Sequence, residues 1–355
     1  MNCTMPISIT STISSGLNTA RTAIYHRHHR QQANIRLATI EAARGKTDPA
    51  QVRLAQDYAA DVLGWKGYAP WLVTYTAMAG TFKEGWMPDN YFGKVVLPTL
   101  NGSLGAITAS KSITGRFFDC DAFPDIGAYV NGLLFNADGE VVDDDTFFAG
   151  LFAHSDRIVF KVDGLNRGEG VRTYEKSTFD LSRVKASGNG VFQTYIQQHE
   201  YFARYTQSPV AALRLTTLID NQGKCRVRTS YLKLGRVGEQ TALSATFIRL
   251  PIDVETGIYS GDAHYDSWTM SPQHPDTPTP LEGFTVPRFH DAAALAMKLH
   301  TKHPYIRLMG WDMTVDSDNQ IKILECNGGH TEIRSSEAIN GPHFTDMGWE
   351  NLWQD

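Results

Sequence analysis

Residues 310–329 (GWDMTVDSDNQIKILECNGG) constrain the fold of this chain most, because two apolar stretches flank a short polar segment. Asp and Asn tolerate the backbone angles of tight turns, so the central Asp-Ser-Asp-Asn predicts a β-hairpin. With a four-residue turn, Asp312 would face Ile323, and Glu325 and Asn327 would lie diagonally beyond Asp312 on the same face. The pattern therefore predicts three oxygen-bearing side chains at the open end of one hairpin.

Such a cluster of oxygen atoms suits Mg²⁺, which takes one or two carboxylates and completes its coordination with water and phosphate oxygens. A solvated hairpin end fits the local pattern equally well. An EF-hand calcium loop beginning at Asp316 does not fit. Ile321 stands where that loop needs Gly, and Asn327 stands where it needs a bidentate Glu.

The composition is that of an ordinary globular protein, with 355 residues of which 42% are hydrophobic and 20% charged. This length allows two or three subdomains. A formal net charge of -5 argues against nucleic acid as the main partner. No stretch approaches the roughly 18 apolar residues that a membrane span needs. The four cysteines lie far apart without zinc-site spacing, which is typical of the reducing cytoplasm.

The N-terminal part of the chain predicts helices. Residues 17–44 are polar, Ala-rich and free of Pro, which favours one long helix. Asp48 can cap a second helix that has Pro49 at its first position. Residues 64–105 are rich in Gly and aromatic side chains and receive no assignment.

From about residue 110 the pattern changes to short strands and helices, which predicts an α+β arrangement. Strands are expected at 157–162 and 191–196, a hairpin over 211–234, and a helix over 288–303 that ends before Pro304.

Two segments are candidate phosphate-binding loops. In FKVDGLNRGEGV, Lys161 lies within a strand and Gly164, Gly168 and Gly170 follow, which fits a phosphate cradle or an ordinary Gly-rich turn. The glycine spacing fits a Rossmann fingerprint poorly. Residues 105–112 (GAITASKS) nearly match a P-loop, but no apolar strand precedes them.

Taken in order, these elements resemble the ATP-grasp superfamily. The segments KSITGRFF, VFQTYIQQHEYF, LRLTTLID and the hairpin are most similar to the sugar-transfer-associated ATP-grasp family. The resemblance implies an α+β fold in which two α+β subdomains clamp ATP behind a helical N-terminal region. The implied divisions are residues 1–105, with a possible substrate-binding part, 106–190 with the Gly-rich flap, and 191–355 with the Mg²⁺-binding hairpin.

The same resemblance implies a role for individual residues. Lys161 and Arg214 would act on the transferred phosphate, and Arg334 and Arg236 would contact substrate. After Gly235 the chain departs from many family members, because it lacks their Asn and paired glycines, which weakens a substrate role for Lys233 and Arg236. The residues implied to bind ATP are Lys111, Lys161, Gly164, Gly168, Gly170, Gln193, Tyr195, Ile196 and Gln198. The residues implied to bind Mg²⁺ are Asp312, Glu325 and Asn327.

The implied activity is that of a carboxylate–amine ligase, with ATP and Mg²⁺ as cofactors and small-molecule substrates. ATP would phosphorylate a carboxylate, either sugar-linked or from an amino acid, and an amine would displace the phosphate to form an amide. Positioned cations supply most of the catalysis in phosphoryl transfer, so no protein nucleophile is required. A kinase acting on a hydroxyl group and a non-catalytic nucleotide-binding module are the alternatives.

Overall fold

The structure is a computed structural model that describes residues 9–165, 168–239, 246–259, 261–277, 279–281, 283 and 285–354, with the backbone alone for residues 9–18. The chain divides into two compact units, Met1–Val96 with Glu337–Asp355, and Leu97–Ser336. The first unit is helical, and the second carries both β-sheets. In the described part of the chain, no helix is long and apolar enough to cross a membrane.

Helices make up the first unit. The predicted long helix is confirmed as α1 (Ile9–Arg44), which begins before residue 17. α2 (Pro49–Asp61) begins as predicted, because the Asp48 carboxylate accepts a hydrogen bond from the Ala50 amide at 2.9 Å. The elements that follow are η1 (Lys66–Tyr68), α3 (Ala69–Ala79), α4 (Asp89–Tyr91), η2 (Phe92–Val96) and η5 (Trp349–Asn351). Nearly every side chain of α3 is buried, so its sequence has no amphipathic period to detect.

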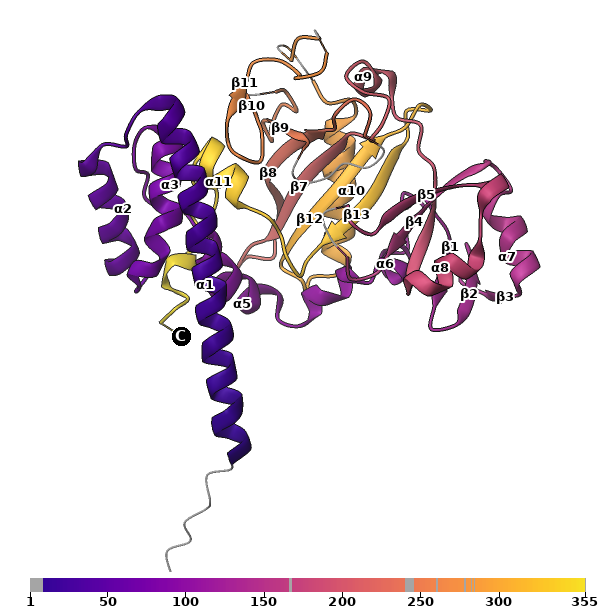
Figure 1. Cartoon of the computed structure of the whole chain (residues 1–355), viewed down its shortest axis with the longest axis horizontal. Coiled ribbons are helices and arrows are strands. Elements are labelled where there is room, and N and C mark those ends of the chain that lie inside the picture. Colours follow the sequence, from indigo (N-terminus) through magenta and orange to yellow (C-terminus); the bar gives the residue numbers. More distant parts are fainter. Residues whose placement is uncertain are drawn as a thin grey trace, which may run out of the picture. The chain divides into compact units, whose positions relative to one another are not determined.

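The second unit begins with short helical elements and then forms a six-stranded antiparallel sheet (Figure 1). The strand order is β3-β2-β1-β6-β4-β5. Side chains of α7 and α8 pack with this sheet around Phe160 and Phe192. The strands are β1 (Asp125–Val130), β2 (Leu133–Asn136), β3 (Val141–Val142), β4 (Arg157–Val162), β5 (Val171–Glu175) and β6 (Gly190–Thr194). The helices are α5 (Leu97–Asn101), η3 (Leu104–Ala109), α6 (Lys111–Phe118), α7 (Asp144–Leu151), η4 (Lys176–Thr178) and α8 (Leu181–Ser187).

A seven-stranded antiparallel sheet follows, with the order β11-β10-β9-β8-β7-β12-β13. Its strands are β7 (Ala212–Ile219), β8 (Cys225–Leu234), β9 (Ile248–Pro251), β10 (Ala263–His264), β11 (Met270–Ser271), β12 (Leu308–Val315) and β13 (Ile321–Asn327). The other elements here are α9 (Glu200–Ala203), α10 (Phe289–Lys302) and α11 (Arg334–Asn340). The β7–β8 hairpin and α10 confirm the predictions for residues 211–234 and 288–303.

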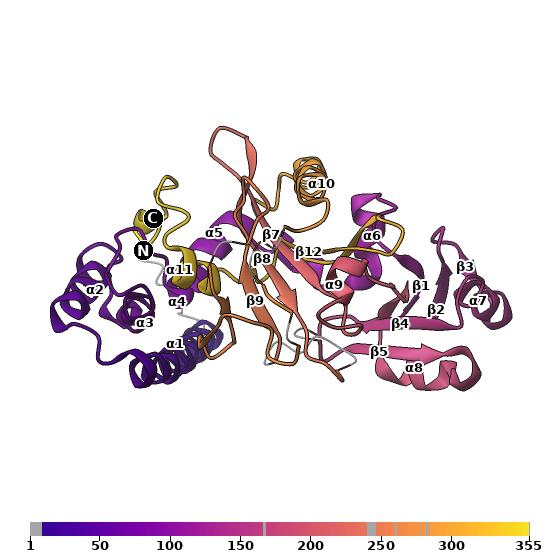
Figure 2. The ribbon, with the colours of Figure 1, turned by 90° about the horizontal axis from the view of Figure 1, so that it is seen from above.

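The two faces of the seven-stranded sheet differ in chemistry. Helix α10 covers one face against β7, β8 and β12, where Leu215, Leu232 and Trp311 are buried (Figure 2). Side chains alternate between the faces of a strand, so the residues between these apolar ones point the other way. We call that side the polar face. The register places the following residues on it: Arg214, Thr216, Thr229, Tyr231, Lys233, Arg249, Asp312 and Glu325.

The register of the β12–β13 hairpin corrects the prediction. Asp312 pairs with Glu325 rather than with Ile323. The turn contains one residue more than predicted, with Asn319 in the left-handed region at φ 58°. A β-bulge also leaves Leu324 without a partner on β12. Together these two irregularities shift the register by two residues, so the side-chain faces are preserved while Glu325 moves directly opposite Asp312.

Candidate active site

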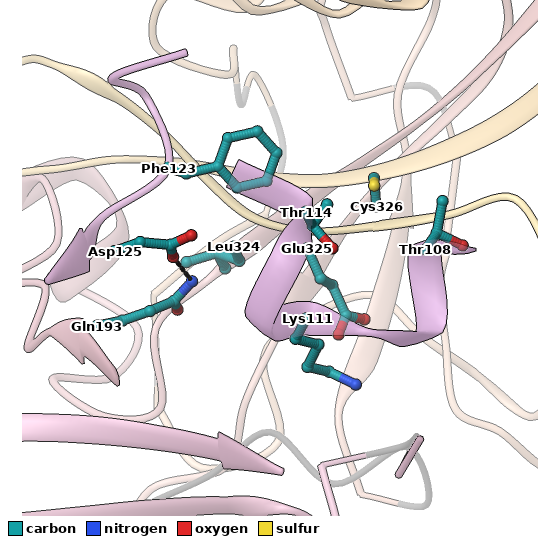
Figure 3. Close-up of a pocket in the computed structure, with 9 residues that line it drawn as sticks. All are labelled: Thr108, Lys111, Thr114, Phe123, Asp125, Gln193, Leu324, Glu325 and Cys326. Carbon is teal, nitrogen blue, oxygen red and sulfur yellow. Dashed lines mark hydrogen bonds between the residues drawn. The ribbon is translucent and has the colours of Figure 1, made fainter. Parts of the chain in front are cut away.

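A pocket in the second unit brings together residues that lie far apart in the sequence (Figure 3). Lys111 comes from α6, Gln193 from β6 and Glu325 from β13, and all three were predicted to act on ATP or its metal ion. On the side of the six-stranded sheet, the Gln193 side-chain amide donates a hydrogen bond to the Asp125 carboxylate at 2.8 Å. The pocket is lined by Thr108, Lys111, Thr114, Phe123, Asp125, Gln193, Leu324, Glu325 and Cys326.

Lys161 links the six-stranded sheet to the hairpin. Its ammonium group donates a hydrogen bond to the Leu324 carbonyl oxygen at 2.8 Å. The β-bulge leaves Leu324 without a cross-strand partner, which frees that carbonyl group. Burial lowers the pKa of Lys161, and the nearby carboxylates of Glu325 and Asp125 oppose that shift. Lys161 therefore places a buried amino group next to the predicted metal ligands.

Asp312 is enclosed by two cations on the polar face. Arg214 donates from Nε and Nη2 to its two oxygens at 2.7 and 2.8 Å, and the Lys233 ammonium group lies 2.8 and 2.9 Å from the same oxygens. Burial alone would raise the pKa of Asp312, but the charges of Arg214 and Lys233 hold it far below its ordinary value. The Asp312 carboxylate is therefore ionised, and its oxygens already have charged partners.

The metal prediction can be tested against this donor set. Asn327 lies beside Glu325, with its amide nitrogen 3.4 Å from a carboxylate oxygen, so one carboxylate and one amide are adjacent. This pair fits Mg²⁺, which takes few protein ligands and keeps positions for phosphate oxygens. Asp312 can bind the same ion only if its contacts with Arg214 and Lys233 break. In the described part of the chain, no three His, Cys, Asp or Glu residues group as a metal site.

The beginning of the Gly-rich loop is held against the start of α6. The Gly164 amide donates to the Ala109 carbonyl oxygen at 2.9 Å, and the Lys111 ammonium group donates to the Leu165 carbonyl oxygen at 2.6 Å. Asp163 accepts hydrogen bonds from the amide and hydroxyl groups of Ser112 at 2.9 and 2.5 Å. A carboxylate thus caps the helix whose N-terminus a P-loop would offer to phosphate, which argues against that alternative.

Two glycines of the predicted flap, Gly164 and Gly168, have positive φ angles of 74° and 83°. Gly170 precedes β5, and a side chain there would come within 2.9 Å of the Leu165 side chain. The middle of the predicted flap, Asn166 and Arg167, lies outside the described residues.

The remaining predicted adenine contacts lie in the connection that follows β6. The Gln198 side chain is committed to the protein, because it donates to the Thr206 carbonyl oxygen at 2.5 Å and accepts from the Ala211 amide at 2.8 Å. Tyr195 and Ile196 are partly buried. A role for this connection in binding adenine stays a prediction, and it would fall to backbone groups rather than to the Gln198 side chain.

The two predicted substrate residues have acidic neighbours. Arg236 forms a fork with Asp276, with nitrogen–oxygen distances of 2.7 and 2.6 Å. The Arg334 Nε atom lies 3.6 Å from a Glu332 oxygen. Burial opposes ionisation of Glu332, but the positive charges of Arg334 and Arg249 lower its pKa to about 2.

Sequence reasoning missed Arg249 on the polar face, and it assigned no site role to Lys233 because the chain departs from the family pattern after Gly235. A short signal was present, because Tyr231 and Lys233 alternate with Leu232 and Leu234 at the end of their strand. Arg249 gave no such signal, since it stands alone between apolar neighbours in FIRLP.

Two antiparallel sheets, one carrying Lys161 and the other carrying the β12–β13 hairpin that Lys161 contacts, give the second unit the α+β architecture of an ATP-grasp fold. Residues 174–345 match the model of the family described as sugar-transfer associated ATP-grasp. Comparison with curated proteins gave no match.

Solved structures with similarity to the chain include nucleotide-bound enzymes. The biotin carboxylase domain of Hydrogenobacter thermophilus 2-oxoglutarate carboxylase, with MgADP, has a TM-score of 0.43 and 11% identity over 70% of this chain and 46% of that chain. N5-carboxyaminoimidazole synthetase from Staphylococcus aureus, with ADP, has a TM-score of 0.41 and 11% identity over 67% and 50%. The D-alanine-D-alanine ligase of Coxiella burnetii has a TM-score of 0.39 and 8% identity over 72% and 61%.

This chain therefore spans less than two thirds of the length of those proteins.

Lys161→Met is expected to weaken nucleotide binding about ten- to a hundredfold, because a hydrogen bond to a charged group contributes about 1.5–3 kcal/mol. The Met side chain keeps the apolar stem within the strand and removes only the ammonium group. Calorimetric titration with MgADP measures the effect. Lys176→Met, at an exposed ion pair with Asp156 at 4.0 Å, is the matched control. Equal affinities for the two variants would mean that Lys161 serves only the Leu324 contact.

Proposed function

We propose that this protein is an ATP-dependent carboxylate–amine ligase that forms an amide through an acyl phosphate. The observation that carries the proposal is the gathering of buried cations around the hairpin. Lys161 donates a hydrogen bond to the Leu324 carbonyl oxygen, and Arg214 and Lys233 both contact Asp312. Asp312 in turn pairs directly with Glu325 in the hairpin. Such a set suits a reaction in which negative charge spreads over phosphate oxygens.

In the first step, a carboxylate oxygen of the acid attacks the γ-phosphorus of ATP, the bond to the β-phosphate bridging oxygen breaks, and ADP leaves. Lys111 and Lys161 would hold the phosphate oxygens, and Arg214 would stabilise the transferred group. In the second step, the amine nitrogen attacks the acyl carbon, inorganic phosphate leaves, and the amine loses a proton. These residues act by position and charge, and none forms a covalent intermediate.

Glu325 and Asn327 would hold Mg²⁺ in this proposal. When bound, the ion supplies positive charge to the phosphate oxygens. Asp312 would act differently from these two residues. Its four short contacts with Arg214 and Lys233 would hold both cations beside the phosphate site. If Asp312 also binds the ion, the two cations must move to the phosphates when nucleotide enters.

Hydroxylamine tests the reaction without knowledge of the natural amine, because it captures acyl phosphates as hydroxamates. The enzyme is incubated with ATP, Mg²⁺, hydroxylamine and pools of carboxylic acids, and products are identified by mass spectrometry. We expect ADP, inorganic phosphate and a hydroxamate in equal amounts. A product that retains the phosphate on a hydroxyl group would instead identify a kinase, and MgATP binding without any turnover would identify a non-catalytic module.

A further inference from the structure

Arg249 on β9 is a buried cation without a full set of partners. It lies on the polar face directly opposite Lys233 and is only 4% exposed. A guanidinium group has five N–H donors, and here Nη2 donates to Asp266 at 3.0 Å. Among the residues that the structure describes, Nε and Nη1 have no hydrogen-bond partner. A buried charged donor without an acceptor destabilises the folded protein, so a bound acceptor would stabilise Arg249.

Two other arginines of the second unit differ from Arg249 in this respect. Arg214 and Arg236 each use Nε and Nη2 together in a fork to one carboxylate. Arg249 donates to Asp266 from Nη2 alone, and the Asp266 side chain is 31% exposed. In Arg249 only Nη2 of that edge has an acceptor, so Nε and Nη1, which are buried and have no partner among the described residues, remain for a second acceptor.

The surroundings of Arg249 favour an anion. Its guanidinium carbon lies 4.6 Å from the centre of the Phe247 ring, and the Lys233 ammonium group lies 5.6 Å from the same centre. Phe247 is 4% exposed, so two cations share one apolar neighbour away from water. The charge of Arg249 also lowers the pKa of Glu332, but that carboxylate already accepts hydrogen bonds from the Tyr231 hydroxyl at 3.1 Å and the Ser335 amide at 2.9 Å.

The position of Arg249 separates it from the proposed phosphoryl-transfer residues. In the sheet order, β8 lies between β9 and β7, which carries Arg214. Neighbouring strands lie about 4.8 Å apart, so Arg249 is anchored roughly 10 Å from the Arg214 strand. A group bound at Arg249 is therefore a different part of the substrate from the reacting carboxylate.

We propose that Arg249 binds a second anionic group, a carboxylate or a phosphate, carried by the acid substrate. This inference rests on the proposed ligase function and names the class of acid: one with two anionic groups separated by a distance on the order of 10 Å. Lys233 supplies further positive charge, and Phe247 holds both cations in a low-dielectric position, which strengthens binding of an anion. Arg249 then selects the substrate and positions it, while Arg214 acts at the reacting end.

The test measures binding, so it does not depend on turnover. Terminal dicarboxylates from succinate to suberate, and phosphono acids of the same lengths, are titrated by calorimetry against monocarboxylates of equal chain length, with MgADP present. We expect at least one dianion to bind the natural enzyme about tenfold or more tightly than its matched monocarboxylate. Tighter binding of the dicarboxylates would identify the second anionic group as a carboxylate, and tighter binding of the phosphono acids would identify it as a phosphate.

Arg249→Gln should abolish the preference and leave MgADP affinity unchanged, while Arg226→Gln, an exposed ion-pair residue on β8, should keep it. Arg249→Lys retains the charge without the fork and should show an intermediate preference, which serves as the readout if the Gln variant does not fold. The proposal is overturned if the natural enzyme prefers no dianion, or if the preference survives in the Gln variant or stays at the natural level in the Lys variant.

The hydroxamate assay separates this inference from the ligase proposal. If the preferred dianion binds through Arg249 and no hydroxamate forms from any acid, the ligase proposal fails and the anion site stands. If hydroxamates form from monocarboxylates as readily as from dianions, the ligase stands and the Arg249 proposal fails.

Discussion

Replacing Glu325 by Gln is expected to lower the rate of ATP turnover at least about a hundredfold, because the lost charge is worth several kcal/mol at a metal-bound phosphate. Gln keeps the shape of the side chain and its place opposite Asp312 in the hairpin. The fold should therefore survive, as judged by an unchanged melting temperature. ADP release measured over a range of Mg²⁺ concentrations should show that the variant also needs more Mg²⁺ for half-maximal activity.

Asp318→Asn is the matched control for this prediction. It makes the same kind of change in the same hairpin, at an exposed turn position away from the pocket. The control should retain natural turnover and Mg²⁺ dependence. Turnover of Glu325→Gln close to that of the control would remove Glu325 from the proposed site.

Asp312→Asn is expected to destabilise the protein by about 3–5 kcal/mol, which is the usual effect of removing one partner from a buried ion pair. The variant leaves Arg214 and Lys233 buried without the charge that compensates them. Chemical denaturation measures the change in the free energy of unfolding. The structure thus alters the outcome expected from the hairpin alone, in which Asp312 serves only as a metal ligand and its replacement spares the fold.

An exposed pair of the same geometry provides the control for Asp312→Asn. Arg236 and Asp276 form an equally short fork, but their side chains are 34% and 21% exposed. Asp276→Asn should therefore cost less than about 1 kcal/mol. Adding Lys233→Met to Asp312→Asn should recover part of the lost stability, because one unpaired charge is removed. Equal losses for the buried and exposed variants would contradict a buried charge cluster at Asp312.

The same measurements decide whether Asp312 also binds the metal ion. If it does, Asp312→Asn should raise the Mg²⁺ requirement for nucleotide binding as Glu325→Gln does. If Asp312 only orients the two cations, the variant should bind Mg²⁺ normally and lose affinity for the phosphates.

The sequence by itself determined the order of the elements and the identity of several pocket residues. Apolar stretches on either side of polar turn residues predicted the β12–β13 hairpin and the β7–β8 hairpin. Capping residues predicted where α2 begins, since a cap acts within one helical turn. The sequence predicts Lys111, Gln193 and Glu325 as site residues, and the structure places all three in one pocket, while their roles in catalysis stay predictions.

Only the tertiary structure decided the register of the hairpin and the state of its charges. The bulge at Leu324 depends on how β13 pairs with β12. The Leu324 carbonyl oxygen then accepts a hydrogen bond from Lys161, which belongs to the six-stranded sheet. Arg214 and Lys233 meet Asp312 through pairing of strands about 80–100 residues apart in the chain. Burial, and with it the pKa of Asp312 and the open donors of Arg249, depends on these long-range contacts, which no local pattern of residues encodes.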